Sequence, residues 1–168
     1  MAEQKKLKVH IESGDEKIDF EGDPDAVLSA TIDFLTKAYP GYEILQELIF
    51  TPDLRGLAES LEGVLQIAPE GILLTSPKDL PAEDAICLAL MGSYIGNQFK
   101  KYPKDSLSTN ELAKVTGKAM KTMFNQLAWM VDDGIVERVE RGEYRLTSRG
   151  IKKTEEVIKQ LKTQEEKP

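Results

Sequence analysis

The side chains best suited to chemistry cluster in the second half of the chain. Lysine can hold a phosphate group or the edge of a guanine, and asparagine or glutamine can form two hydrogen bonds with an adenine. Polar residues of these kinds recur along one predicted helix, residues 118–132: Lys118, Lys121, Thr122, Asn125 and Gln126. Three arginines follow in a predicted hairpin at 135–147: Arg138, Arg141 and Arg145. The chemistry that these residue types offer is reversible binding, not bond cleavage.

Residues that catalysis or metal binding would require are scarce. The chain has one cysteine and one histidine, which excludes an internal disulfide and a Cys/His zinc cluster. Cys87 lies among apolar residues of a predicted long helix, which indicates a small core residue. His10 falls on the polar side of a predicted strand, and nothing beside the nearby carboxylates suggests a buried environment that would raise their pKa. We therefore expect no enzyme activity, no cofactor and no metal site.

Two short helices must position the polar residues of 118–132. Ser108 or Thr109 can accept a hydrogen bond at the start of the first helix, and Glu111 stands near the capping-box position. This helix ends at Gly117, because glycine suits a left-handed turn conformation. In the second helix, apolar residues recur at i, i+4 and i+7 and predict one buried stripe: Met123, Leu127 and Met130.

A β-hairpin with a basic tip follows the second helix. Two extended runs, 135–139 and 144–147, are separated by Glu140-Arg141-Gly142-Glu143. The short motifs of this part of the chain are Glu111-Leu112-Ala113, Thr116-Gly117, Lys121-Thr122, Leu127, Gly134-Ile135-Val136, Arg138, Gly142, Tyr144, Leu146-Thr147 and Gly150. This pattern resembles the winged-helix superfamily, in particular the compact winged-helix proteins of archaea and bacteria. The resemblance covers about half of the chain, from near residue 83 to the C-terminus.

The resemblance implies a DNA-binding protein. In a DNA-binding winged helix, the second short helix enters the major groove and basic side chains hold the surrounding phosphates. Carried over to this chain, the helix 118–132 and the wing 135–147 would contact double-stranded DNA, with Arg141 reaching the minor groove from the wing tip. The contacting residues would be Lys118, Lys121, Thr122, Asn125, Gln126, Arg138, Arg141 and Arg145. A transcriptional regulator is the function that this implies.

An alternative function follows from apolar residues on the same helix. Met120 and Phe124 are four residues apart and share a face, and Trp129 falls on another side, in addition to the predicted core stripe. A helix that is apolar on three sides is either deeply buried or contacts another surface. The three residues therefore predict either packing within the chain, near Tyr94 and Phe99, or a non-enzymatic interaction module of a larger complex whose winged helix binds protein.

The first half predicts a separate, smaller α+β domain. Alternating apolar residues predict a β-hairpin at 7–11 and 17–20, and Asp23-Pro24 predicts a helix start. Helices at about 42–50 and 52–61 and a second hairpin at 64–68 and 72–75 are expected to follow. We thus predict an α+β fold with an N-terminal domain at 1–76, a linker at 77–82 and a winged-helix domain at 83–168. The last of these includes a long leading helix and a C-terminal helix.

Charge also separates the two halves. The net charge of the chain is −7, but residues 83–168 hold 15 Lys+Arg and 13 Asp+Glu, a balance of +2. Residues 1–82 hold the other 7 and 16, a balance of −9. Because the acidic half would repel phosphates, DNA binding must be confined to one face of the second half.

The distribution of apolar residues predicts where the protein is located and how it could assemble. No apolar run approaches the roughly 20 residues that a membrane span needs, and residues 1–8 lack the apolar core of a signal peptide, so we expect a cytoplasmic protein. The C-terminal helix places apolar residues and one threonine at 3-4-3 spacing: Ile151, Thr154, Ile158 and Leu161. This seam either pairs two subunits as a homodimer or covers the core of one subunit.

Overall fold

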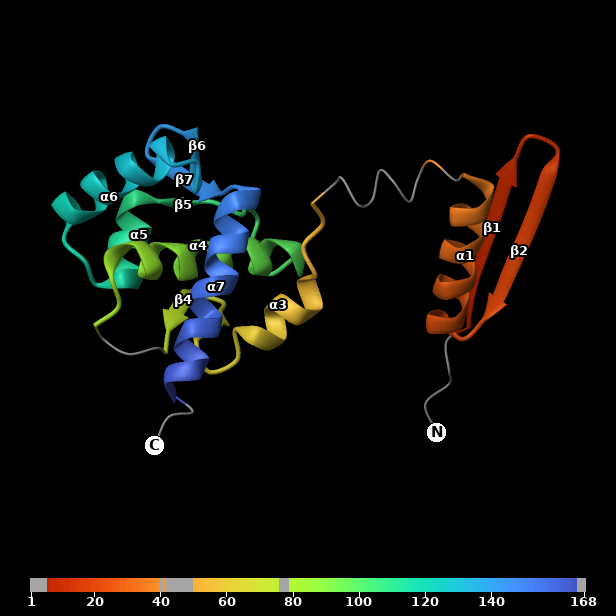
Figure 1. Ribbon diagram of the computed structural model, residues 1–168, viewed down its shortest axis with the longest axis horizontal. Helices are drawn as coiled ribbons and strands as arrows, with labels where there is room; N and C mark the ends of the chain where they lie inside the picture. The colour runs from red at the N-terminus through yellow and green to blue at the C-terminus, as the bar shows by residue number, and fades with distance from the viewer. Residues whose placement is uncertain (1–5, 40, 42–49, 76–78, 166–168) are drawn as a thin grey trace. The chain divides into compact units, whose positions relative to one another are not determined.

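The protein is described by a computed structural model for residues 6–39, 41, 50–75 and 79–165. The chain divides into two compact units, unit 1 at Met1–Thr51 and unit 2 at Pro52–Pro168 (Figure 1). Both units combine helices with small antiparallel sheets, so the predicted α+β class is confirmed. No helix in the described ranges combines the length and the apolar character needed to cross a bilayer.

In the described part of unit 1, a β-hairpin packs against a helix. Strands β1 (Leu7–Ser13) and β2 (Glu16–Gly22) pair antiparallel, as predicted, and α1 (Pro24–Ala38) packs against them. The helix begins as its sequence indicates, because the Asp23 side chain accepts a hydrogen bond from the Asp25 N–H and Pro24 occupies the first turn. Phe20 of β2 contacts Phe34 of α1, with ring centroids 6.3 Å apart. The helix predicted at 42–50 lies outside the described residues, apart from Phe50.

Unit 2 begins with a helix and a second hairpin. These elements are α3 (Leu54–Ser60), β3 (Leu65–Ala68) and β4 (Gly71–Leu74), and all three were predicted. The Asp53 side chain accepts a hydrogen bond from the Gly56 N–H and caps α3. The two strands pair antiparallel around a two-residue turn, with Ala68 opposite Gly71.

The division between the units differs from the predicted linker at 77–82. The first hairpin of unit 2 packs on the long helix α4 (Ala82–Gln98), whose Gly92 faces the side chain of Ile72. A Cβ atom at Gly92 would lie 3.1 Å from Ile72 Cγ2, so the glycine permits this close approach. The hairpin and α3 therefore share the core of the second half, and the boundary falls at 51/52, before them.

Helix α4 is the centre of unit 2. Every residue from Ala85 to Ser93 is buried. The β3–β4 hairpin covers α4 on one side, and the helices and strands that come after α4 in the chain complete the cover. Those elements are β5 (Leu107–Ser108), α5 (Thr109–Thr116), α6 (Met120–Asp132), β6 (Val136–Glu140), β7 (Glu143–Leu146) and α7 (Ser148–Glu165). The three strands form one antiparallel sheet in the order β5-β7-β6.

The local signals for α5 and α6 are confirmed. Ser108 and Glu111 form the expected capping box, and Gly117 ends α5 with a φ of 68°. The predicted stripe of α6 is in the core, with Met123, Leu127 and Met130 at most 1% exposed.

Helix α7 uses its apolar seam within the chain. Ile151, Thr154 and Ile158 are at most 5% exposed, and α7 lies against α4. The close approach of α7 to the residue before β6 depends on Gly150, because a Cβ atom there would lie 2.0 Å from the backbone oxygen of Ile135. Of the two predicted uses of the seam, the structure shows the covering of the core.

Candidate nucleic-acid interface

The polar surface begins at the turn between α5 and α6. Gly117 has a left-handed backbone, and the Lys118 N–H donates a hydrogen bond to Thr116 Oγ1 over 3.3 Å. The N-cap residue of α6 is Ala119, which provides no side-chain hydrogen bond, whereas α1, α3 and α5 are each capped by an oxygen. The first amides of α6 therefore remain available to water or to an anion.

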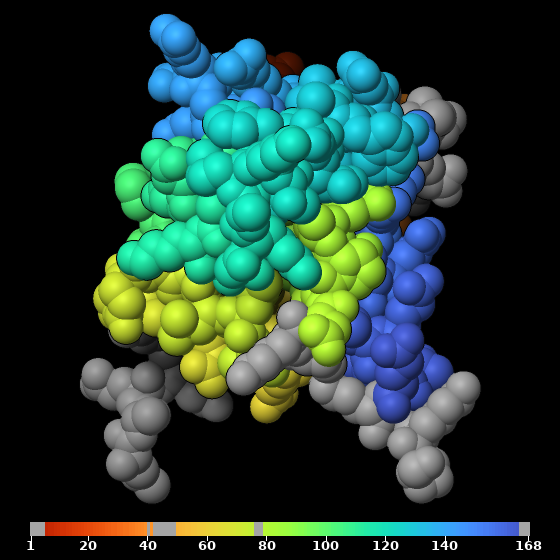
Figure 2. Space-filling view, turned by 90° about the vertical axis from the view of Figure 1, so that its left-hand side faces the viewer, coloured from red at the N-terminus to blue at the C-terminus, as the bar shows by residue number. Residues whose placement is uncertain are grey.

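The outward face of α6 carries three of the predicted contact residues. Lys121 and Asn125 are exposed on the side of the helix opposite its buried stripe, and Thr122 is exposed on a flank. Gln126 is half-buried and Lys118, in the turn, is also half-buried. Neither lysine forms an ion pair with any residue in the described ranges, so both charges are free to meet a phosphate. Figure 2 shows this side of unit 2, with α5 and α6 facing the viewer.

The three arginines of the β6–β7 hairpin have different surroundings. Arg141 is exposed at the tip, beside Gly142 with its φ of 77°, and has no ion-pair partner within the described part of the chain. Arg138 lies over the ring of Tyr144, with its guanidinium carbon 6.0 Å from the ring centroid. Arg145 is held by two carboxylates, in Glu137 at 2.6 Å and Asp105 at 3.9 Å.

The predicted set is therefore only partly brought together. The exposed members of the set are Lys121, Thr122, Asn125 and Arg141, and Lys118 is half-buried. Neither Lys121 nor Arg141 has an ion-pair partner among the described residues. The charge of Arg145 is largely neutralised by its two partners. Gln126 lies at the edge of the buried face.

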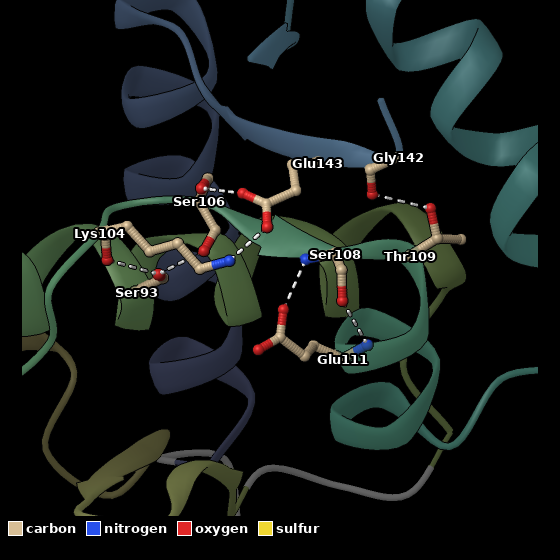
Figure 3. Close-up of polar contacts among 8 residues, drawn as sticks. All are labelled: Ser93, Lys104, Ser106, Ser108, Thr109, Glu111, Gly142 and Glu143. Carbon is tan, nitrogen blue, oxygen red and sulfur yellow. Dashed lines mark hydrogen bonds and ion pairs between the residues drawn. The ribbon is translucent and has the colours of Figure 1, made fainter. Parts of the chain in front are cut away.

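A polar cluster at the tip end of the β6–β7 hairpin was not predicted. Glu143 of β7 pairs with Lys104 and accepts a hydrogen bond from the Ser106 hydroxyl over 2.8 Å (Figure 3). Both contacts stabilise the carboxylate and lower the pKa of Glu143. Lys104 and Glu143 are 39 residues apart, and no strand was predicted at 107–108, so nothing in the sequence indicated this contact. The cluster fixes the hairpin to the segment before β5.

The apolar residues of α6 are exposed, so packing near Tyr94 and Phe99 does not bury them. The exposed fractions are 36% for Met120, 57% for Phe124 and 48% for Trp129. With about 100° between successive residues, Met120 and Phe124 share one flank of α6, whereas Trp129 lies about 140° away from Phe124. The sequence reasoning missed a fourth residue, Val131, which is 38% exposed on the flank of Met120 and Phe124.

Groups suited to other chemistry are separated or buried. His10 of β1 is exposed and its ring nitrogens contact Asp19 and Glu12 at 2.7 and 3.2 Å, which raises the pKa of the imidazole. Cys87 is fully buried in α4, and burial raises the pKa of its thiol to about 12, so it is not a nucleophile. Within the described ranges, no three His, Cys, Asp or Glu side chains are grouped closely enough to hold a metal ion.

Comparison of the chain with protein-family models, with curated proteins and with solved structures gives no match.

Proposed function

We propose that unit 2 is a winged helix that binds double-stranded DNA, with α6 in the major groove and the tip of the β6–β7 hairpin on the neighbouring backbone or minor groove. The observation that carries the proposal is the exposed face of α6, where Lys121, Thr122 and Asn125 point away from the core. The activity is binding alone, and transcriptional regulation is the role that such binding would serve.

The order of the elements supports this assignment. Two short helices joined by a three-residue turn are followed by a two-stranded hairpin, and a short strand before the first helix pairs with the hairpin. In winged-helix proteins this arrangement holds the second helix outward, which is how a helix reaches base edges in the major groove. An asparagine at the position of Asn125 can form two hydrogen bonds with an adenine.

The distribution of charge also supports it, although the chain is acidic. Two carboxylates of the hairpin are neutralised within the chain, Glu137 by Arg145 and Glu143 by Lys104. Lys118, Lys121 and Arg141 have no such partner within the described ranges. Uncompensated cationic side chains therefore lie around the turn before α6 and at the hairpin tip, where phosphates would be held.

The test is a fluorescence-anisotropy titration of the full chain with mixed-sequence duplex DNA at low and physiological salt. Binding is expected to weaken steeply as salt rises, because phosphate contacts release counterions. Lys121→Glu and Arg141→Glu should each weaken binding by about tenfold and reduce the slope of log K against log salt by about one.

A matched control is available on α7. Lys159→Glu changes the net charge by the same amount, and Lys159 is an exposed residue of a helix outside the proposed contact. Its affinity for DNA should stay close to that of the unaltered chain. If all three variants bind DNA as tightly as the unaltered chain does, the proposal is wrong.

A second candidate function is protein binding by α6. It is favoured by the exposed strip of Met120, Phe124 and Val131 along one flank of the helix. A second copy of this chain is the partner that can be tested at once, by sedimentation velocity over a range of concentrations with the unaltered chain and Phe124→Ser. Self-association that Phe124→Ser abolishes, together with no affinity for DNA at low salt, would replace the first candidate with this one.

A further inference from the structure

A cleft of about 620 Å³ lies on unit 2 between the β3–β4 hairpin, α5 and the segment 102–107. Its volume is within the range of ligand sites in proteins. Gly71, Ile72, Leu73 and Leu74 of β4 all contribute to its wall, and none of its lining residues belongs to α6. Successive side chains of a strand point to opposite faces, so a cleft lined by consecutive residues lies at the edge of β4.

The edge of β4 that faces the cleft has open hydrogen-bonding groups. The Thr75 N–H donates to the Val64 carbonyl over 3.0 Å, so these two residues form a hydrogen-bonded pair of the ladder. By the register of the hairpin, Leu73 and Gly71 occupy the next bonded pairs with β3. Bonded pairs alternate along an antiparallel ladder, so Ile72 and Leu74 direct their N–H and C=O groups away from β3. Within the described ranges, these four groups have no hydrogen-bond partner.

Part of the backbone around the opposite wall of the cleft is already used within the chain. The Ser108 N–H donates to the Glu111 carboxylate over 2.7 Å, and the buried Ser93 hydroxyl lies 3.4 Å from the carbonyl oxygens of Lys104 and Ser106 (Figure 3). The edge of β4, with its two consecutive outward-facing residues Ile72 and Leu74, offers the regular row of backbone groups that a strand edge presents to an occupant. An occupant that bonds to a strand edge is itself an extended polypeptide.

We propose that this cleft binds an extended peptide segment of a partner protein, which adds to the free edge of β4 as a third strand. All four residues of β4 line the cleft, so the segment pairs along the length of this strand. The α5 wall and the segment 102–107 leave room for a single chain, which excludes the β3–β4 hairpin of a second copy because that strand is flanked by its own α5.

The lining defines the chemistry of the segment. Its apolar part comes from Ile72, Leu74, Leu107 and Val115, so the segment carries apolar residues at alternate positions. Of the charged residues around the cleft, Lys104 is paired with Glu143 and Glu111 is used as a cap. Lys114 and Glu70 are left for the segment, which therefore carries a carboxylate toward Lys114 and a basic residue toward Glu70.

The test uses random heptapeptides displayed on phage and selected on the immobilised full chain. An enriched peptide is then synthesised with a fluorophore and titrated by anisotropy, without DNA, so that the result is independent of the proposed DNA binding. Leu74→Pro removes one of the free N–H groups and leaves the bonds between β3 and β4 in place, because proline is tolerated at such an edge position. It should weaken peptide binding about fivefold or more, and clearly more than Leu74→Val, which retains the N–H and alters only the apolar side chain.

Amide hydrogen exchange gives a second readout that needs no variant. In the free protein the amides of Ile72 and Leu74 should exchange faster than those of Leu73 and Thr75, and the peptide should slow the first two. Failure to enrich any peptide, equal binding to Leu74→Pro, or protection confined to amides outside β4 would each overturn the proposal. Equal binding to Leu74→Pro would indicate a pocket for apolar side chains and not a strand site.

Discussion

Lys121 and Arg145 carry the same charge on the same unit, but their surroundings give them different roles. Arg145 lies between Glu137 and Asp105, so its charge is used to fix the hairpin. Lys121 points to solvent without an ion-pair partner among the described residues. An exposed ion pair contributes only about 0–1 kcal/mol to stability, but it removes both charges from contact with a ligand. The free cation is therefore the better candidate for phosphate binding.

Glu140 provides a complementary test of the proposed DNA contact. It is exposed next to Arg141 at the end of β6 and would repel phosphates at the hairpin tip. Glu140→Gln should raise the affinity for duplex DNA by about threefold at low salt, with a smaller gain at high salt. Glu62→Gln, at an exposed position before β3, is the control and should leave the anisotropy titration unchanged. An equal gain from both variants would point to net charge alone and contradict docking by the hairpin.

The pKa of His10 predicts a pH dependence for unit 1. The hydrogen bond to Asp19 contributes most and the one to Glu12 contributes less, and both raise the pKa of the imidazole above its ordinary value of about 6.5. A raised pKa in the folded state means that the stabilisation is complete below that ordinary value and is lost as the pH rises through the folded pKa. An NMR titration of the His10 ring should give a midpoint above about 6.5, and Asp19→Asn should lower it. The same midpoint in both proteins would show that the carboxylate does not act on His10.

At the scale of the element, helix ends show how local chemistry decides structure. The capping box of α5 satisfies two groups that would otherwise lack partners, through Ser108 Oγ and the Glu111 carboxylate. Ser108→Ala should lower the free energy of unfolding of unit 2 by about 1 kcal/mol, measured by urea denaturation. Asn110→Ala, two positions further along the same helix, should be neutral or slightly stabilising. Equal losses from the two substitutions would mean that the cap is not the cause.

Such local signals account for what the sequence could predict. The caps at Asp23 and Ser108, the left-handed Gly117 and the core stripe of α6 each depend on residues within a few positions of one another. The contact between Lys104 and Glu143 depends on residues 39 apart, and its partners can be chosen only when the strand pairing is known. The pairing of Arg145 with Asp105 was missed for the same reason.

At the scale of the whole molecule, the boundary at 51/52 was the main difference from expectation. Residues 76–81 have the proline-rich, polar composition of a linker, but composition does not report that Ile72 packs against Gly92. Packing across a turn is a property of the assembled core. The β3–β4 hairpin therefore belongs to unit 2, although a linker-like segment follows it.

Truncation tests this division. A fragment of residues 52–168 should unfold in one cooperative transition near that of unit 2 in the full chain, because it retains α3, β3 and β4 against α4. A fragment of residues 77–168 exposes the face of α4 around Gly92 and should lose several kcal/mol of stability or fail to fold. Circular dichroism during heating distinguishes the two. Equal melting temperatures would place the boundary at the linker-like segment after all.

The position of Trp129 makes α6 observable without a label. It is the single tryptophan of the chain and is 48% exposed on α6. The tryptophan fluorescence of the folded protein, excited selectively over its five tyrosines, therefore originates from one side chain, close to the surface proposed to meet DNA. Its emission maximum reports how far the indole is exposed to water. Its quenching by iodide or acrylamide measures how much of the indole a bound molecule shields. DNA on the exposed face would shield the indole, whereas a peptide in the cleft, none of whose lining residues belongs to α6, would leave it open to the quencher.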